Sequence, residues 1–164
     1  MIVKDGSLQL PEKMSDYIKN LRKKIGHETV IMPCACVIIG DGKGNILLQQ
    51  RNDDGKWGYH GGAIEIDESV EEALRREVKE ELNLTLNRIE LLGIYSGAEY
   101  HHVYPNGDEC SCIDIVYVCH DYSGDMTFTD GEVTYTAWFN KTNLPENISD
   151  NPRKPIHDYF AKYF

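Results

Sequence analysis

The 164-residue sequence has no uninterrupted apolar run approaching the roughly 20 residues that a membrane-spanning helix needs. Its N-terminus lacks the basic and apolar regions of a secretory signal peptide. Cationic residues are scarce, since 17 Lys and Arg stand against 27 Asp and Glu, and the formal net charge is −10. Non-specific nucleic-acid binding needs clustered Lys and Arg, so this composition argues against it. We therefore expect a cytoplasmic protein that binds neither membranes nor nucleic acids.

The five cysteines lack the patterns of the common cysteine sites. An odd number without a secretory signal argues against a disulfide framework, and no Cys-x-x-Cys pair of the zinc-knuckle type occurs. Cys34 and Cys36 alternate within one apolar run, as do Cys110 and Cys112, so each pair should share one face of a strand. We interpret them, and Cys119, as small buried hydrophobic side chains. A zinc site is the alternative, and the spacing disfavours it.

Turn residues and apolar periodicity divide the chain into strands and helices. Helices are predicted over residues 11–25, 70–82 and 151–164, and strands over 29–39, 46–50, 89–104, 109–120 and 133–139. The length suits one domain, residues 1–164, in which residues 1–27 form an N-terminal helical extension. Pro152 and Pro155 limit where the last helix can begin. The order of elements indicates an α/β fold, with a mixed sheet between helical layers.

Three glutamates crowd one face of the predicted central helix. Glu77, Glu80 and Glu81 are spaced at i, i+3 and i+4, which places them on the same face. Their mutual repulsion is unfavourable unless a cation offsets it. Arg76, four residues before Glu80, is expected to hold one carboxylate and not three, whereas Mg²⁺ or Mn²⁺ would supply the missing charge through oxygen ligands. A solvated face with ordinary pairs to Lys or Arg is the alternative.

The flanking residues indicate where this helix begins and what approaches it. Ser69 and Glu72 have the spacing of a capping box, so the helix should begin at Val70. Asn83 follows the last turn, where a residue that tolerates left-handed backbone is favoured. Upstream, the Gly-Gly pair at residues 61–62 lets backbone approach the helix closely, because glycine has no Cβ. The apolar stripe toward the core consists of Val70, Leu74, Val78 and Leu82.

The segment 62–84 resembles the Nudix box, the signature of the Nudix hydrolases. The matching residues are Gly62, Glu68, Arg76, Glu77, Val78, Glu80, Glu81, Leu82 and Leu84. Asn83 stands in place of the near-terminal glycine, and Asn is the next best residue for a left-handed cap. His60 and Asp67 also depart from a proline and a glycine that are often found at these positions. The resemblance implies the Nudix fold, an α/β/α sandwich with a mixed sheet.

The resemblance also implies a chemistry, the metal-dependent hydrolysis of a phosphoanhydride bond in a nucleoside diphosphate linked to another moiety. The metal would be Mg²⁺ or Mn²⁺, which neutralises charge developing on phosphate oxygens. Its implied ligands are the main-chain carbonyl of Gly61 and the carboxylates of Glu68, Glu77, Glu80 and Glu81. Arg76 would orient neighbouring carboxylates, and Glu132, in a late loop, is the candidate general base. An ordinary acidic turn is the alternative for Glu132.

The substrate is less well defined than the reaction. Candidate contacts are Arg51, Tyr59, His60 and Tyr100, although packing or surface exposure would also account for each of them. Tyr100 lies where dinucleoside polyphosphate enzymes of the family tend to have tyrosine, and the proline typical of ADP-ribose enzymes is absent from that window. Nucleoside triphosphates, ADP-ribose and dinucleoside polyphosphates all remain candidates.

Two further questions stay open at this level. The same fold could bind a nucleotide without turning it over, as a sensor module, although a pure binder has no need to retain three clustered carboxylates. The N-terminal helix carries an apolar stripe at Met14, Ile18, Leu21 and Ile25. That stripe suits either packing on its own domain or the interface of a homodimer.

Overall fold

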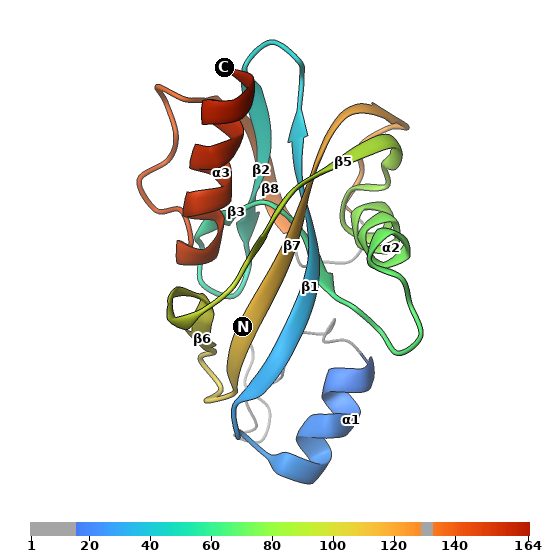
Figure 1. The fold of residues 1–164 in the computed structure, drawn as a ribbon, viewed down its shortest axis with the longest axis vertical. Helices are drawn as coiled ribbons and strands as arrows, with labels where there is room; N and C mark the ends of the chain where they lie inside the picture. The colour runs from blue at the N-terminus through green and yellow to red at the C-terminus, as the bar shows by residue number, and fades with distance from the viewer. Residues whose placement is uncertain (1–15, 129–132) are drawn as a thin grey trace.

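The computed structural model describes residues 16–128 and 133–164. Its helices are α1 (Asp16–Ile25), α2 (Val70–Leu82) and α3 (Asp150–Tyr163), and a short 3₁₀ turn spans Ala98–Tyr100. Its strands are β1 (Val30–Gly40), β2 (Asn45–Arg51), β3 (Trp57–Gly58), β4 (His60–Ala63), β5 (Thr85–Tyr95), β6 (His101–Val103), β7 (Glu109–Ser123) and β8 (Val133–Asn140). Figure 1 shows α2 and α3 on opposite sides of the long central strands, with α1 at one end.

The eight strands form one mixed sheet, and its mixed character was predicted from the sequence. β3 and β4 were not among the five strands predicted. Its main path runs β3-β2-β1-β7-β5, with β4 paired to β1, β6 to β7 and β8 to β2. The central pair, β1 and β7, is parallel and in continuous register from Val30 opposite Cys110 to Ile39 opposite Cys119. The remaining strand pairs of the described chain are antiparallel. Because helices cover both faces of β1, its sequence is an almost unbroken apolar run.

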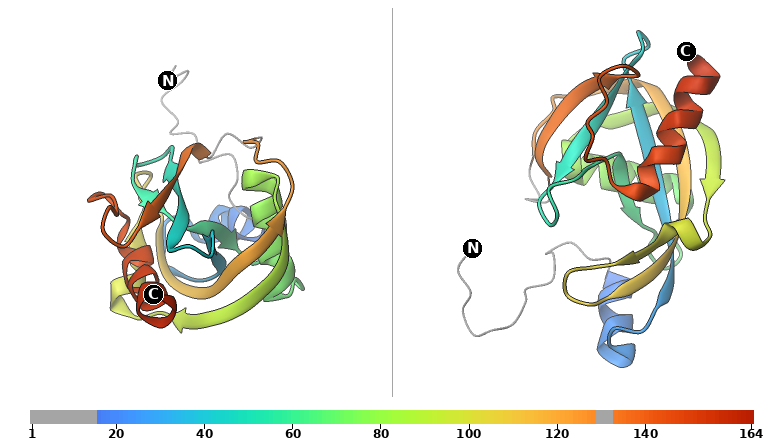
Figure 2. Two further views of the ribbon diagram at one scale, coloured as in Figure 1. Left: turned by 90° about the horizontal axis from the view of Figure 1, so that it is seen from above. Right: turned by 90° about the vertical axis from the view of Figure 1, so that its left-hand side faces the viewer.

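The two faces of the sheet enclose separate hydrophobic cores. On one side Ala35 and Val37 of β1 pack with the apolar stripe of α2. On the other side Cys34 and Ile38 of β1 pack with the buried side chains of α3. The sheet is strongly curved, which is clearest in the two views of Figure 2. The arrangement confirms the sandwich of a mixed sheet between helices.

The ends of α2 confirm its predicted caps, and α1 also ends at a residue in left-handed conformation. The Ser69 side chain accepts a hydrogen bond from the Glu72 amide while the Glu72 side chain accepts one from the Ser69 amide, so the capping box is complete. Asn83 closes α2 in left-handed conformation, with φ of 58°. Gly26, with φ of 64°, follows α1 in the same conformation.

Two element predictions were wrong in their boundaries. The strand expected over residues 89–104 is instead β5, which begins at Thr85 and ends at Tyr95, followed by the 3₁₀ turn and β6. Gly97 interrupts it, because its φ of 109° does not continue an extended strand. In α3, Pro155 lies inside the helix and does not limit its start.

The N-terminal helix packs on its own domain. Ile18, Leu21 and Ile25 all contact the core on the α3 side of the sheet, whereas Met14 lies outside the described residues. Arg22 fixes the helix further, since its guanidinium donates to the carbonyl oxygens of Glu28 and Glu109. The described part of the apolar stripe therefore packs on its own domain.

The five cysteines are free and buried, as expected from the sequence. Cys34, Cys36, Cys110 and Cys112 lie in the core on the α3 side, and Cys119 lies in the core beneath α2. None of the described helices combines the length and apolar character that crossing a membrane requires.

Candidate active site

The acidic face of α2 is directed at the glycine pair of β4. Glu77 and Glu81 are buried, with relative exposures of 8% and 3%, whereas the Glu80 side chain is 41% exposed. A Cβ atom on Gly62 would lie only 2.6 Å from the carboxyl carbon of Glu77. The glycine therefore gives the Glu77 carboxylate its place against the sheet.

The Glu81 carboxylate accepts two long hydrogen bonds and lies near a nitrogen of His60. The Gly61 amide donates to Oε2 at 3.3 Å, and the Gln49 side-chain amide donates to Oε1 at 3.4 Å. The nearest nitrogen of His60, Nδ1, is 3.7 Å from Oε2. Within the described residues no Lys or Arg forms an ion pair with Glu81. A buried carboxylate with only long contacts to such donors is suited to accept a cation.

Arg76 organises the other carboxylates and corrects one expectation. It was expected to hold one carboxylate, but its guanidinium forms a two-bond pair with Glu68 at 2.7 and 2.9 Å, contacts Glu77 at 2.5 Å and lies 3.6 Å from Glu80. The planar guanidinium can do this because it presents five N–H donors in a fork. These hydrogen bonds lower the pKa of Glu68 and raise that of Arg76.

The carboxylates therefore fall into two groups. Arg76 gathers Glu68, Glu77 and Glu80 on one side, and Glu81 lies among Gly61, Gln49 and His60 on the other. In the described part of the chain, these glutamates do not bring three oxygens within 4.8 Å of one another. Glu77 and Glu81 are one helical turn apart on the buried face, and their oxygen donors fit a hard divalent cation such as Mg²⁺ or Mn²⁺.

The structure places the predicted substrate residues in different environments. Arg51 is partly exposed and forms a two-bond pair with Asp53, at 2.9 and 2.6 Å. Tyr59 and Tyr100 are buried, and burial raises the pKa of Tyr100 to about 12. His60 is fully buried, and neither of its ring nitrogens has a hydrogen-bond partner.

These positions divide the predicted residues by role. The exposure of Arg51 at the end of β2 suits contact with a substrate. The position of His60 behind Glu81 suits support of that carboxylate instead. Glu132, the candidate base, lies outside the described residues.

Sequence reasoning missed a buried carboxylate on β7. Asp114 is 4% exposed and accepts a hydrogen bond from the Tyr59 hydroxyl. Burial raises the pKa of Asp114. The signal was present, because Asp114 continues the alternation of Cys110 and Cys112 on the inward face of the strand.

Comparisons of the sequence and of the fold with known proteins agree on one family. A family model described as the NUDIX domain matches residues 31–160. An ADP-ribose pyrophosphatase of Methanocaldococcus jannaschii is 33% identical over 116 residues, which are 70% of this chain and 64% of that protein. A MutT-like protein of Streptomyces ambofaciens is 28% identical over 107 residues, 65% of this chain and 62% of that protein. This chain thus spans less than two thirds of the length of both curated relatives.

Solved structures share the fold. A MutT NUDIX hydrolase from Burkholderia pseudomallei has a TM-score of 0.66 at 27% identity, covering 80% of this chain and 98% of that one. The NUDIX domain of Shewanella oneidensis NrtR, solved with ADP ribose, also has a TM-score of 0.66, at 17% identity, over 92% of this chain and all of that one. The region matched by the family model contains the glycine pair, the acidic helix and the parallel central strands, and the chain belongs to the NUDIX family.

Proposed function

We propose that this protein is a pyrophosphohydrolase that cleaves a phosphoanhydride bond in a nucleoside diphosphate linked to another moiety, with Mg²⁺ or Mn²⁺ as cofactor. The observation that carries the proposal is the arrangement of Glu77 and Glu81, two buried carboxylates of one helix held against the glycine pair of β4. Such clustering is costly in a protein that only binds a ligand, whereas hydrolysis of a charged anhydride needs it.

Each residue around the acidic helix has its own proposed role in the reaction. Glu77 and Glu81, with the Gly61 carbonyl, are proposed to hold the cation, which when bound neutralises charge on phosphate oxygens. Glu68 and Glu80, which Arg76 gathers beside Glu77, stay proposed ligands on the family resemblance. Arg76 positions Glu77 and joins it to Glu68 through a shared guanidinium. Gln49 and the Gly61 amide each donate one long hydrogen bond to an oxygen of Glu81. Glu132 stays the proposed general base on the family resemblance alone.

The substrate proposal is drawn from the relatives. The Methanocaldococcus jannaschii relative is named an ADP-ribose pyrophosphatase, and a relative from Enterobacter, 29% identical over 119 residues, is named a nucleoside triphosphatase. We therefore propose ADP-ribose and nucleoside triphosphates as the first compounds to test. Dinucleoside polyphosphates follow, because of Tyr100. A sensor module that binds without turnover is the competing function, and turnover separates the two.

The test is hydrolysis of these three compound classes with Mg²⁺, scored by released monophosphate or pyrophosphate. We expect turnover of at least one compound and a loss of about two orders of magnitude or more in Glu77→Gln and in Glu81→Gln, because each removes a charge-stabilising ligand. Glu71→Gln, on the exposed face of the same helix, is the matched control and should keep wild-type rates.

Two outcomes would count against the proposal. Unchanged rates in both glutamine variants would overturn the site. Saturable binding of a nucleotide with no product, in Mg²⁺ and in Mn²⁺, would favour the sensor.

A further inference from the structure

The α3-side face of the central strand pair carries an unusual set of side chains. Cys34 and Cys36 come from β1, and Cys110, Cys112 and Asp114 come from β7. All five are buried, with exposures of 8% or less. The Glu77 and Glu81 carboxylates come from α2, which packs on the opposite face of the sheet. The thiols therefore lie on the other face of the sheet from the helix that carries the proposed magnesium ligands, although Glu81 interacts electrostatically with Cys36.

Strand register brings three of these side chains together. β1 and β7 are parallel, with Cys34 directly opposite Asp114 and Cys112 two residues earlier on the same face of β7. One ligand atom from each of Cys34, Cys112 and Asp114 lies within 4.8 Å of the other two. A tetrahedral zinc site with bonds of about 2.3 Å to sulfur separates its sulfur ligands by about 3.8 Å, so the three atoms are close to a ligand arrangement.

The second observation is what surrounds the Asp114 carboxylate. Its carboxylate accepts hydrogen bonds from the Tyr59 hydroxyl and the Asn151 side chain, which are both neutral donors. Among residues 16–128 and 133–164, no Lys, Arg or His forms an ion pair with it. A carboxylate removed from water without a cation is costly. Carboxylates that bind metals are commonly hydrogen-bonded from outside in the way that Tyr59 and Asn151 hold this one.

We propose that Cys34, Cys112 and Asp114 form a second metal site, which binds a thiophilic divalent cation, Zn²⁺. Two thiolates and one carboxylate suit zinc and not magnesium, since magnesium takes oxygen ligands only. The three ligands leave one tetrahedral position for a further donor. The sulfur of Cys110, 3.4 Å from that of Cys112, adds a thiol beside the site.

The sequence disfavoured zinc because it contains no Cys-x-x-Cys pair. That pattern is required only when neighbouring ligands come from one local turn. Here the proposed ligands come from two paired strands. The register of that pairing, and not a short spacing in the sequence, brings them together.

The test uses the full-length protein, stripped of metal with a chelator and titrated with Co²⁺ as a spectroscopic probe. We expect a near-ultraviolet thiolate-to-cobalt charge-transfer band that saturates at one equivalent, and one equivalent of Zn²⁺ that displaces the Co²⁺ and stays bound through desalting. Cys112→Ser and Asp114→Asn should each reduce the retained zinc to near zero. Cys34→Ala tests the same site independently, should one of these variants fail to fold.

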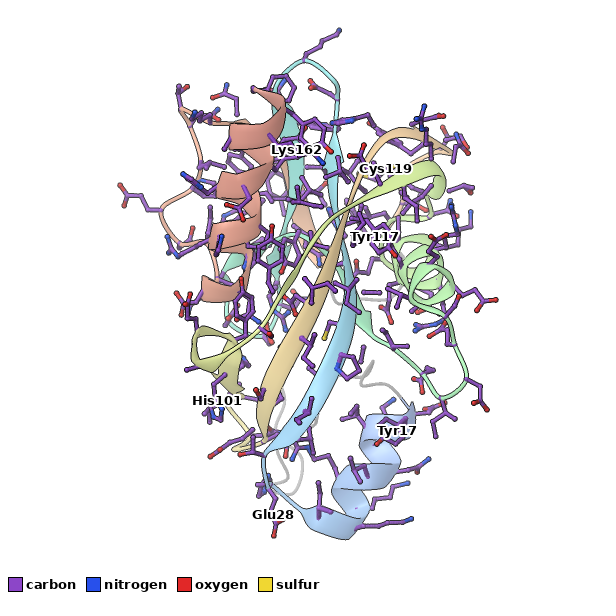
Figure 3. All side chains as sticks on the ribbon, in the orientation of Figure 1. Tyr17, Glu28, His101, Tyr117, Cys119 and Lys162 are labelled. Atoms are coloured by element: carbon purple, nitrogen blue, oxygen red, sulfur yellow. The ribbon has the colours of Figure 1, made fainter. Side chains whose placement is uncertain are left out.

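Two controls separate this site from the remaining buried thiols and from the acidic helix. Cys119→Ser removes a buried thiol of β7, labelled in Figure 3, that lies in the core beneath α2. This variant should keep the band. Glu81→Gln should also keep it, so that failure of the proposed hydrolysis is not confused with failure of the zinc site. Absence of a charge-transfer band in the wild-type protein, or a full band in folded Cys112→Ser and Cys34→Ala, would overturn the proposal.

Discussion

At the scale of single residues, neighbouring glycines of β4 impose different limits on the chain. A Cβ on Gly61 would lie 2.1 Å from the carbonyl oxygen of Ala35, and its φ of 135° disfavours any other residue. The three atoms nearest to a Cβ on Gly62 would all belong to the Glu77 carboxylate, at 2.6 to 2.9 Å. Backbone cannot yield to a methyl group, whereas a flexible side chain can.

We therefore predict opposite phenotypes for two alanine substitutions. Gly62→Ala should fold with a Tm near that of the wild type but lose at least about tenfold in kcat/KM, because the Glu77 carboxylate is displaced. Gly61→Ala should lose stability itself, by about 2 kcal/mol or more. Thermal melts and steady-state rates on both variants make the comparison. Full activity in Gly62→Ala would show that Glu77 does not need its observed position.

Residue-scale predictions succeeded where local geometry decides them. The common face of Glu77 and Glu81 follows from helical spacing alone, and the capping box at Ser69 follows from a three-residue interval. The grouping of Cys34 with Asp114 could not be predicted in this way. It depends on the register of two strands that lie far apart in sequence, and the sequence pattern alone does not specify that register.

At the scale of elements, α3 is joined to β5 by a polar contact that depends on pH. Asp158 of α3 accepts hydrogen bonds from Lys154 at 2.8 Å and from the Tyr95 hydroxyl of β5 at 3.1 Å. Hydrogen bonding by Lys154 lowers the pKa of Asp158 below its ordinary value of 3.8. A carboxyl group whose pKa is lowered by folding stabilises the folded state at pH values above its ordinary pKa. This contribution is lost as the pH falls through the folded-state pKa.

We predict that Asp158→Asn is destabilised at pH 7 and equal to wild type at pH low enough to protonate Asp158. The difference at pH 7 should be below about 1 kcal/mol, because the side chain is one-third exposed and solvent screens the pair. Urea unfolding of both proteins over a pH series from 7 down to about 2 measures it. Glu146→Gln, an exposed carboxylate of the preceding loop, is the control. A difference that persists unchanged in acid would show that the charge of Asp158 is not its cause.

Element boundaries were harder to predict than element types. The parallel pair β1 and β7 was recognisable as two apolar or alternating runs, since strands buried on both faces have that composition. The end of β5 could not be recognised from the sequence, because apolar and aromatic residues continue past Gly97 into the 3₁₀ turn. There a single positive φ outweighs the pattern of the side chains.

At the scale of the whole molecule, two sheet faces carry two different sets of potential metal ligands. The α2 side offers carboxylates, and the α3 side offers thiols with one carboxylate. The net charge of −10 makes cation binding favourable for the molecule as a whole. Since hard cations take oxygen ligands and zinc readily takes sulfur, each face should respond to its own ion.

Any ion that binds only the folded protein stabilises it by mass action, by about 2.7 kcal/mol at one hundred times its dissociation constant. For a chain of this length such a gain raises Tm by roughly 5 to 10 °C. We predict that Mg²⁺ raises the Tm of the wild type and of Cys112→Ser, but not that of Glu81→Gln, after removal of other metals by a chelator. Zn²⁺ should show the reverse dependence on the two variants. If Mg²⁺ does not change the Tm of the wild type, the α2 carboxylates do not bind it. If Glu81→Gln abolishes the Tm increase caused by Zn²⁺, the two proposed sites are not separate.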